Sequence, residues 1–182
     1  MKLTILTAFV AVLTSGCITY STHRYSIAPD NVVALRLLKG QEVNLGLFTA
    51  TAPAQKKIMC RMAPIKTPDN ETFSEFIRKA FLDELRMANV FSPTAPVTLT
   101  GHLNSIDFSS VSGKWNMSLT VSSSNGKQMN VSESYSYTTS YYGDNACNQT
   151  AQALIPAVQN LVGQVVRSRE FSGLIHPIAI AF

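Results

Sequence analysis

The residues of this sequence that most clearly indicate chemistry are its three cysteines. The first of them follows a stretch typical of an export signal. Met1-Lys2 gives a positive start, residues 3–14 form an uncharged apolar run, and Ser15-Gly16 is a small-residue pair. This order describes a signal peptide with its cleavage site, and Cys17 stands directly after that site. The run is too short for a transmembrane helix, which takes about 20 residues.

The other two thiols belong to Cys60 and Cys147. Disulfides persist in exported proteins, so these two most simply pair, which closes a long loop and stabilises the fold by a few kcal/mol. The alternative is two separate buried thiols. A metal site needs more ligands than this pair and three distant histidines, His23, His102 and His176, provide. We therefore expect no metal site and no cofactor.

Catalytic sequence patterns are missing from the chain. It contains no G-x-S-x-G elbow, no H-E-x-x-H and no phosphate-cradling glycine loop. His102 and Asp107 can be drawn as a triad with one of the many serines, but almost any serine-rich chain permits such a drawing. We expect a protein that is not an enzyme.

Composition indicates one folded domain with few charges. Of the 182 residues 46% are hydrophobic and only 14% are charged, against a typical charged share of about 25%. The net charge is +4, and the basic residues are scattered apart from Lys56-Lys57 and Arg167 with Arg169. A nucleic-acid partner requires a basic stripe or patch, so we expect no nucleic-acid partner.

Residues 1–16 are assigned to the signal peptide, residues 17–30 to a polar tether, and residues 31–182 to a single domain.

The first half of the domain is predicted to contain three strands and one helix. Residues 32–38 form an apolar run, residues 42–48 alternate with Val43, Leu45 and Leu47 on one face, and residues 58–62 form a short third strand. Thr72-x-x-Glu75 is a capping box that starts an amphipathic helix ending near Asn89.

The second half is predicted to be a three-stranded meander followed by a helix. Its strands cover about 97–108, 115–121 and 129–141, with a β-bulge near Asn104-Ser105, where the apolar phase slips. Asn125-Gly126 predicts a tight hairpin in which both turn residues adopt positive φ. Residues 146–168 form a helix that Pro156 either kinks or starts. The order indicates an α+β two-layer sandwich, with two helices on one face of a mixed, mostly antiparallel sheet.

One face of the meander is predicted to carry only uncharged polar groups. Antiparallel sheets often leave one face in water, so this is either an ordinary wet surface or a docking face for a partner protein or an envelope polymer. The candidate docking residues are Thr98, Thr100, His102, Asn116, Ser118, Thr120, Ser132, Ser134 and Ser136. On the other face Glu133 interrupts the apolar pattern, and it needs either a partner or a position at the sheet margin.

The stretch from Leu13 to Cys17 resembles a bacterial lipoprotein signal, with Thr14 where such signals usually have leucine. The resemblance implies cleavage between Gly16 and Cys17 and a lipid, such as palmitate, on Cys17. Ile18 stands where an aspartate favours inner-membrane retention, which implies the outer membrane. The alternative is an ordinary secretory signal with a coincidental cysteine.

The full layout resembles small bacterial envelope lipoproteins of the YajG-like group and, more loosely, auxiliary lipoproteins of ABC-type lipid transport systems. The resemblance rests on the signal and on the order of predicted elements, including the helix around residues 76–81 and the hairpin at Asn125-Gly126. It implies an outer-membrane-anchored, periplasm-facing accessory or scaffold protein with an envelope protein partner. The first alternative is a lipid- or glycan-binding subunit of an envelope transport system, and the second is an envelope hydrolase.

Overall fold

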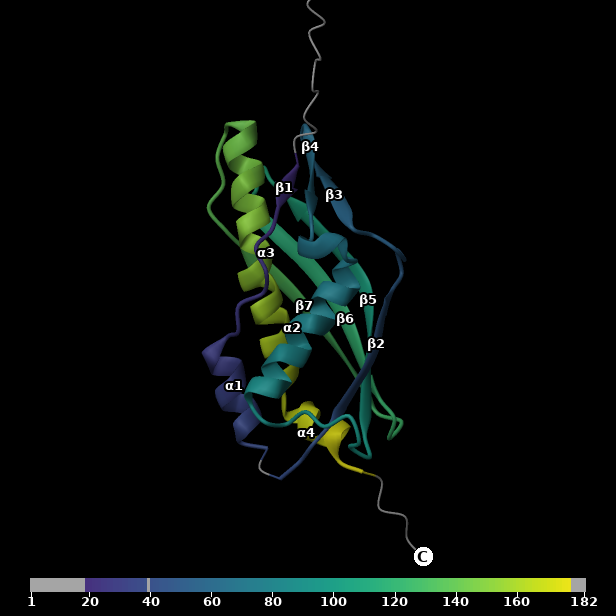
Figure 1. Ribbon diagram of the computed structural model, residues 1–182. Helices are drawn as coiled ribbons and strands as arrows, with labels where there is room; N and C mark the ends of the chain where they lie inside the picture. The colour runs from purple at the N-terminus through teal and green to yellow at the C-terminus, as the bar shows by residue number, and fades with distance from the viewer. Residues whose placement is uncertain (1–18, 39, 178–182) are drawn as a thin grey trace, which may run out of the picture.

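The chain folds into layers of helices and strands, as Figure 1 shows for the computed structural model. The structure describes residues 19–38 and 40–177, so the predicted signal peptide and Cys17 lie outside the described residues. The helices are α1 (Pro29–Arg36), α2 (Phe73–Met87), α3 (Gly143–Val166) and α4 (Arg169–Ile175). Among the described residues, none of these helices combines the length and the apolarity that crossing a bilayer requires.

Two sheets carry the strands of the described chain. The larger has the order β2-β5-β6-β7, with β2 (Asn44–Ala50) parallel to β5 (Thr98–Ser109), and with β6 (Lys114–Ser123) and β7 (Gln128–Ser136) added antiparallel. The smaller has the order β1-β4-β3, formed by β1 (Tyr20–Ser21), β4 (Ala63–Lys66) and β3 (Lys57–Cys60). The predicted α+β class is confirmed, with a second small sheet that the sequence did not indicate.

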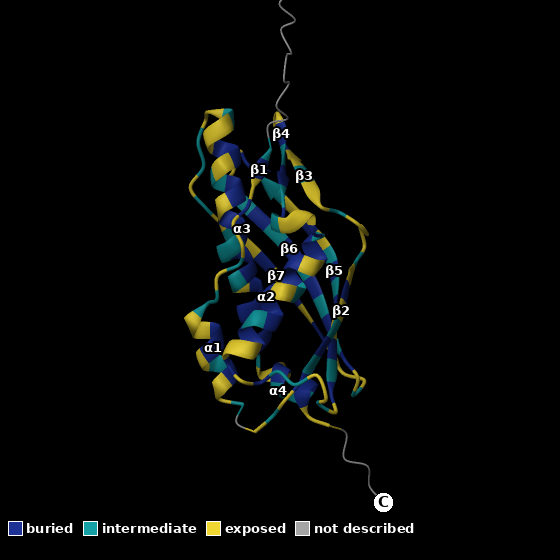
Figure 2. Ribbon diagram, viewed as in Figure 1, coloured by how far each residue is buried: buried dark blue, intermediate teal, exposed yellow. Residues whose placement is uncertain are grey.

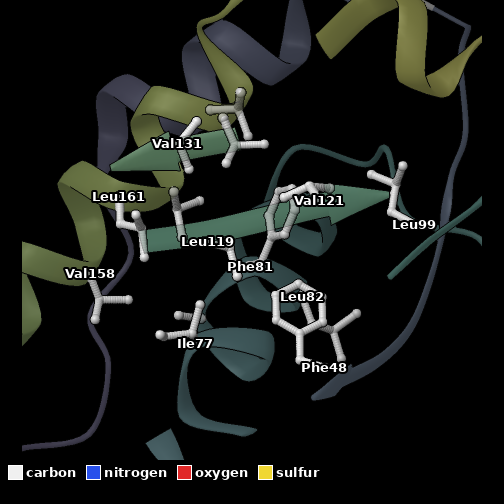
Figure 3. Close-up of a cluster of buried hydrophobic side chains, with 14 of the residues drawn as sticks. Phe48, Ile77, Phe81, Leu82, Leu99, Leu119, Val121, Val131, Val158 and Leu161 are labelled. Atoms are coloured by element: carbon white, nitrogen blue, oxygen red, sulfur yellow. The ribbon is translucent and has the colours of Figure 1, made fainter. Parts of the chain in front are cut away.

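The main core lies between the larger sheet and the helices α2 and α3. The predicted capping box starts α2: Thr72 Oγ1 accepts from the Glu75 backbone N–H, and the Glu75 carboxylate accepts from the Thr72 N–H. The buried side of α2 faces the sheet and its exposed side faces outward (Figure 2). Ile77 and Phe81 of α2 meet Leu119 and Val121 of β6 in this core (Figure 3).

Two local predictions in the meander concern backbone irregularities. The β-bulge is confirmed, because the β5–β6 register shifts between Leu103 and Ser105. The hairpin also forms, but of the two turn residues only Gly126 has a positive φ, +83°. Gly126 N–H donates to Ser123 O, and Ser123 N–H donates to Lys127 O. This is a three-residue loop with one left-handed glycine in place of the predicted two-residue turn.

The predicted strand at 32–38 is wrong, because the segment is helical from Pro29 to Arg36. A short apolar run does not by itself distinguish a strand from a helix. The deciding signal was Pro29-Asp30, since proline at the first helical position and an acid in the first turn start a helix. Val32 and Leu35 then face the core three residues apart.

The tether predicted over residues 17–30 is folded onto the body in the part that the structure describes. Tyr20 and Ser21 form β1 beside Ile65 and Lys66 of β4, and the side chain of Tyr20 is buried. The polar composition of this segment concealed its partners, because parallel pairing with a distant strand leaves no local sequence signal. The folded domain therefore includes β1, which starts at Tyr20.

Four further features differ from the prediction. In β2 a register shift between Leu45 and Phe48 turns Leu47 outward, so Phe48 replaces it in the core. The predicted strand 58–62 is the start of the β3–β4 hairpin, which turns at Arg61 with φ +50°. Helix α3 begins at Gly143 and continues through Pro156, so Pro156 does not mark its start. Helix α4 was not predicted.

Candidate functional site

The outward side of the larger sheet is lined by uncharged polar side chains. The strand period of two sends Leu119 and Val121 into the core and leaves Ser118 and Thr120 outside. Every residue predicted for the docking face is exposed or half-buried here: Thr98, Thr100, His102, Asn116, Ser118, Thr120, Ser132, Ser134 and Ser136. We call these residues, with Asn104 and Asn130, the polar face.

Side chains on neighbouring strands hydrogen-bond to one another across the polar face. Asn104 Nδ2 donates to Thr120 Oγ1 at 3.0 Å, and Thr120 Oγ1 donates to Asn130 Oδ1 at 2.6 Å, which connects β5, β6 and β7. Ser134 Oγ donates to Asn116 Oδ1 at 3.0 Å in a second link between β7 and β6. These bonds hold the side chains in defined orientations, so a partner that binds them has less rotamer freedom to freeze.

Two charged residues flank the polar face at one end. Asp107 of β5 lies outward and accepts a 3.0 Å hydrogen bond from Asn116 Nδ2. Lys114, the first residue of β6, is half-buried and pairs in register with Ser109 and Ser136. The charges therefore lie beside the β5–β6 turn, and the remainder of the face presents hydroxyl, amide and imidazole groups.

His102 and Asp107, which the sequence allowed in a triad, bond to different partners. Both ring nitrogens of His102 contact threonine hydroxyls of the β2 side: Nδ1 lies 2.8 Å from Thr49 Oγ1, and Nε2 lies 3.1 Å from Thr51 Oγ1. Asp107 bonds to Asn116 instead. Within the described ranges, no three His, Cys, Asp or Glu side chains lie together as metal ligands. This site therefore offers hydrogen bonding rather than an assembled acid–base pair.

Glu133 lies on the inner side of β7, the edge strand, and is only 9% exposed. Asn160 Nδ2 donates to its Oε1 at 3.3 Å, and Gln164 Nε2 donates to its Oε2. Both donors are neutral amides of α3. The sequence required either a partner or a position at the sheet margin, and the structure gives Glu133 both. Its two bonds attach α3 to the sheet.

A second buried carboxylate, Glu84 of α2, was not anticipated. It is 0% exposed and accepts from the Tyr25 hydroxyl at 2.6 Å, the Ala28 backbone N–H at 2.9 Å and Asn31 Nδ2 at 3.4 Å. Burial, reinforced by the hydrogen bond to Glu84, raises the pKa of Tyr25. The sequence feature that could have revealed this buried acid is its position inside the apolar stripe of the helix, beside Leu85.

Cys60 and Cys147, expected to pair, form a disulfide that joins the end of β3 to the first turns of α3, with their Cα atoms 5.9 Å apart. The bond lies in a second, smaller core with Tyr20, Ile65 and Ala151. It links segments that are 87 residues apart in the sequence. The smaller sheet and the start of α3 are thereby held together at one end of the molecule.

A hollow of about 460 Å³ lies near the opposite end, between α1 and the residues after α4. Apolar residues such as Leu38 and Val90 share its lining with the charged residues Arg36 and Glu42. The volume is within the range of small-molecule sites. The mixed lining differs from the apolar cleft expected of a lipid carrier.

No family model and no curated protein matches this sequence. Among solved structures, the fold is similar to that of the protein XCC0632 from Xanthomonas campestris, of the family model DUF330, with a TM-score of 0.51, 10% identity, and coverage of 86% of this chain and 96% of that chain. The hypothetical protein CT253 from Chlamydia trachomatis gives a TM-score of 0.48 at 13% identity, over 74% of this chain and 97% of that one. What this chain shares with XCC0632 is therefore its fold.

Proposed function

We propose that this chain is a lipid-anchored, non-enzymatic accessory or scaffold protein of a bacterial envelope complex. It is held at the outer membrane through Cys17, faces the periplasm, and binds a partner protein on its polar face. The proposed anchor rests on the sequence from Leu13 to Cys17. The folded body supports the same arrangement, because its first strand, β1, starts at Tyr20, only three residues after that thiol.

The observation that carries the partner proposal is the hydrogen-bonded ladder of the polar face. Hydroxyl and amide groups cost less to remove from water than ions do. The links through Asn104, Thr120 and Asn130 already fix the side-chain directions. A partner that binds an exposed face with these two properties loses little free energy to desolvation and side-chain ordering. The donors and acceptors of the face give that partner specific contacts.

The edge of the same sheet favours a protein over a polymer as the partner. Strand β7 is an edge strand of the described sheet. Two bonds beside the β6–β7 ladder, Tyr137 N–H to Gly113 O and Ser123 N–H to Lys127 O, establish that odd-numbered residues bond to β6. Even-numbered residues such as Ser132 and Ser134 thus direct their backbone groups away from β6, where an extended peptide can add a strand.

The test is co-purification from detergent-solubilised envelopes, with mass spectrometry of both proteins and lipids. Thr120→Arg combined with Ser134→Arg places two cations on the polar face, and Thr94→Arg adds one on an exposed loop elsewhere. We expect a protein partner to be retained by the wild type and the Thr94→Arg control and lost from the double variant. Equal recovery with all three proteins contradicts docking on this face. Recovery of lipid or glycan alone supports the transport alternative.

The anchor has a separate test in the mass of the mature N-terminus. We expect the chain to begin at acylated Cys17 and to fractionate with outer membranes. Cys17→Ser should leave the precursor uncleaved or release the protein from that fraction. A mature wild-type protein that is freely soluble with an unmodified thiol contradicts the proposal.

A further inference from the structure

Five large apolar side chains are exposed at the end of the molecule where the described chain begins. They come from three separate loops and strands: Met59 and Met62 from the β3–β4 hairpin, Val111 from the β5–β6 turn, and Tyr141 and Tyr142 from the segment before α3. Their exposed fractions are 63%, 80%, 78%, 94% and 74% in that order. We call this set the apolar tip.

Arg61 holds the three parts of the apolar tip together. It lies at the turn of the β3–β4 hairpin, and its Nη1 donates to Tyr141 O at 2.9 Å. Its Nε donates to Ser110 Oγ and its Nη2 to Ser110 O, both at 3.2 Å. Thr139 Oγ1 also donates to Ser110 O, at 2.6 Å. One guanidinium thus connects the hairpin to the turn that carries Val111 and to the segment that carries the two tyrosines.

The tip is also fixed to the body beneath it. The Cys60–Cys147 disulfide joins the residue before Arg61 to α3. Tyr20 Oη donates to Asp144 Oδ1 at 2.6 Å, which ties β1 to the same end of α3. These bonds make the exposed apolar groups a rigid surface rather than a set of independent loops, and a rigid surface loses less conformational entropy when it binds.

The position of the anchor indicates what covers this surface. Strand β1 runs parallel to β4, with Tyr20 beside Ile65, so the N-terminal end of β1 lies on the side of the β3–β4 hairpin turn. Figure 1 shows β1, β3, β4 and the start of α3 at the upper end of the molecule, with α4 at the lower end. Cys17 is three residues before Tyr20, a span of at most about 11 Å.

We propose that the apolar tip rests on the lipid surface, with Tyr141, Tyr142 and Met62 in the interfacial layer and the Arg61 guanidinium at the level of the phosphates. This inference rests on the proposed lipid anchor at Cys17. Tyrosine suits the interface because it has an apolar body and a polar end. The donors of Arg61 are engaged by Ser110 and Tyr141, and its positive charge is what attracts the anionic phosphates.

This contact sets the orientation of the whole body. The strands of the larger sheet run between the upper and lower ends of the molecule (Figure 1), so a bilayer at the tip leaves the polar face at the side, in the aqueous compartment. The anchor and the tip together give the two attachments that stable surface binding requires, and they prevent rotation about the single anchored residue.

The test measures depth in reconstituted vesicles of phosphatidylethanolamine and phosphatidylglycerol that contain a brominated phosphatidylcholine. Tyr142→Trp and Met62→Trp place a reporter at the tip of the full-length lipidated protein. Leu37→Trp is the matched control, because Leu37 is 76% exposed and follows α1 at the lower end. Trp115 is fully buried, so it adds the same background emission to every variant, and circular dichroism in detergent reports that each variant is folded. We expect the tip reporters to be quenched about twofold more than the control.

The two proposals fail in different ways in this experiment. Equal quenching of the tip and control reporters, in a protein that floats with the vesicles, overturns the membrane contact of the tip and leaves the anchor in place. A wild-type protein with no lipid on Cys17 that does not float overturns the proposed function, and this orientation with it. Strong quenching at Met62 and Tyr142 with none at Leu37 supports both.

Discussion

The Tyr25 hydroxyl donates a 2.6 Å hydrogen bond to Oε1 of Glu84, a carboxylate that is 0% exposed. The same oxygen accepts from the backbone N–H of Ala28, the residue that precedes α1. Thus the segment between the proposed anchor and α1 is fastened to α2 by one buried acid. These bonds fasten residues 25–28 to the body, in a segment that the sequence predicted to be a polar tether.

Glu84→Ala should destabilise the protein by about 3 kcal/mol, because it leaves the Tyr25 hydroxyl and the Ala28 N–H, which belong to half-buried residues, without their acceptor. Glu84→Gln retains an acceptor oxygen and should cost less. Asp83→Ala removes a neighbouring, half-buried carboxylate and should change stability by no more than about 0.5 kcal/mol. Urea unfolding followed by circular dichroism measures all three, and equal losses at positions 83 and 84 would contradict the role of Glu84.

Tyr25 should also make the free energy of unfolding depend on pH in the alkaline range. Its pKa is raised above the ordinary value of 10.0, so above pH 10 the unfolded chain releases this proton while the folded chain retains it. The contribution is complete below pH 10 and falls by up to about 1.4 kcal/mol per pH unit above it. Tyr25→Phe removes this dependence.

The measurement is the free energy of unfolding in urea between pH 8 and pH 11. The difference between wild type and Tyr25→Phe should shrink as the pH rises past 10. Tyr142→Phe is the control, because Tyr142 is 74% exposed, and its profile should run parallel to that of the wild type. A constant difference between wild type and Tyr25→Phe would refute the assignment.

Reduction of the Cys60–Cys147 disulfide should cost about 2–5 kcal/mol, because the bond closes a loop over a separation of 87 residues. A thiol reductant should lower the thermal midpoint of the wild type. It should leave the midpoint of Cys60→Ser combined with Cys147→Ser unchanged. If the reductant has no effect on a wild type shown to carry free thiols, the disulfide does not stabilise the fold.

Gly101→Ala should destabilise the protein by about 1–3 kcal/mol, the usual range for overpacking. A Cβ at this position would lie 2.5 Å from the Phe48 ring, so either the buried ring or the β2–β5 pairing must shift. Phe48→Leu in the same chain should recover part of the loss. In the matched control, Gly173→Ala, the nearest contact is the flexible end of Lys127 at 3.4 Å, and little change is expected. Thermal unfolding distinguishes the two glycines.

Elements with a local signal were predicted well. The capping box of Thr72 and Glu75 locates the start of α2, and the phase slip at Asn104-Ser105 locates the bulge. Elements that depend on distant partners were not. β1 exists because Tyr20 pairs with Ile65, and Leu47 is exposed because Phe48 packs over Gly101. The candidate docking residues were predicted because side chains alternate along a strand whatever its neighbours are.

By itself, the sequence determined the class of the fold, the identity of the polar face and the pattern that predicts an anchor at Cys17, since each depends on short-range periodicity or on adjacent residues. Only the tertiary structure decided that Arg61 joins three segments into the apolar tip and that Glu84 holds the segment before α1. Both arrangements bring together residues that are tens of positions apart in the chain. Packing and the need to satisfy buried polar groups determine such contacts. The local order of residues does not reveal them.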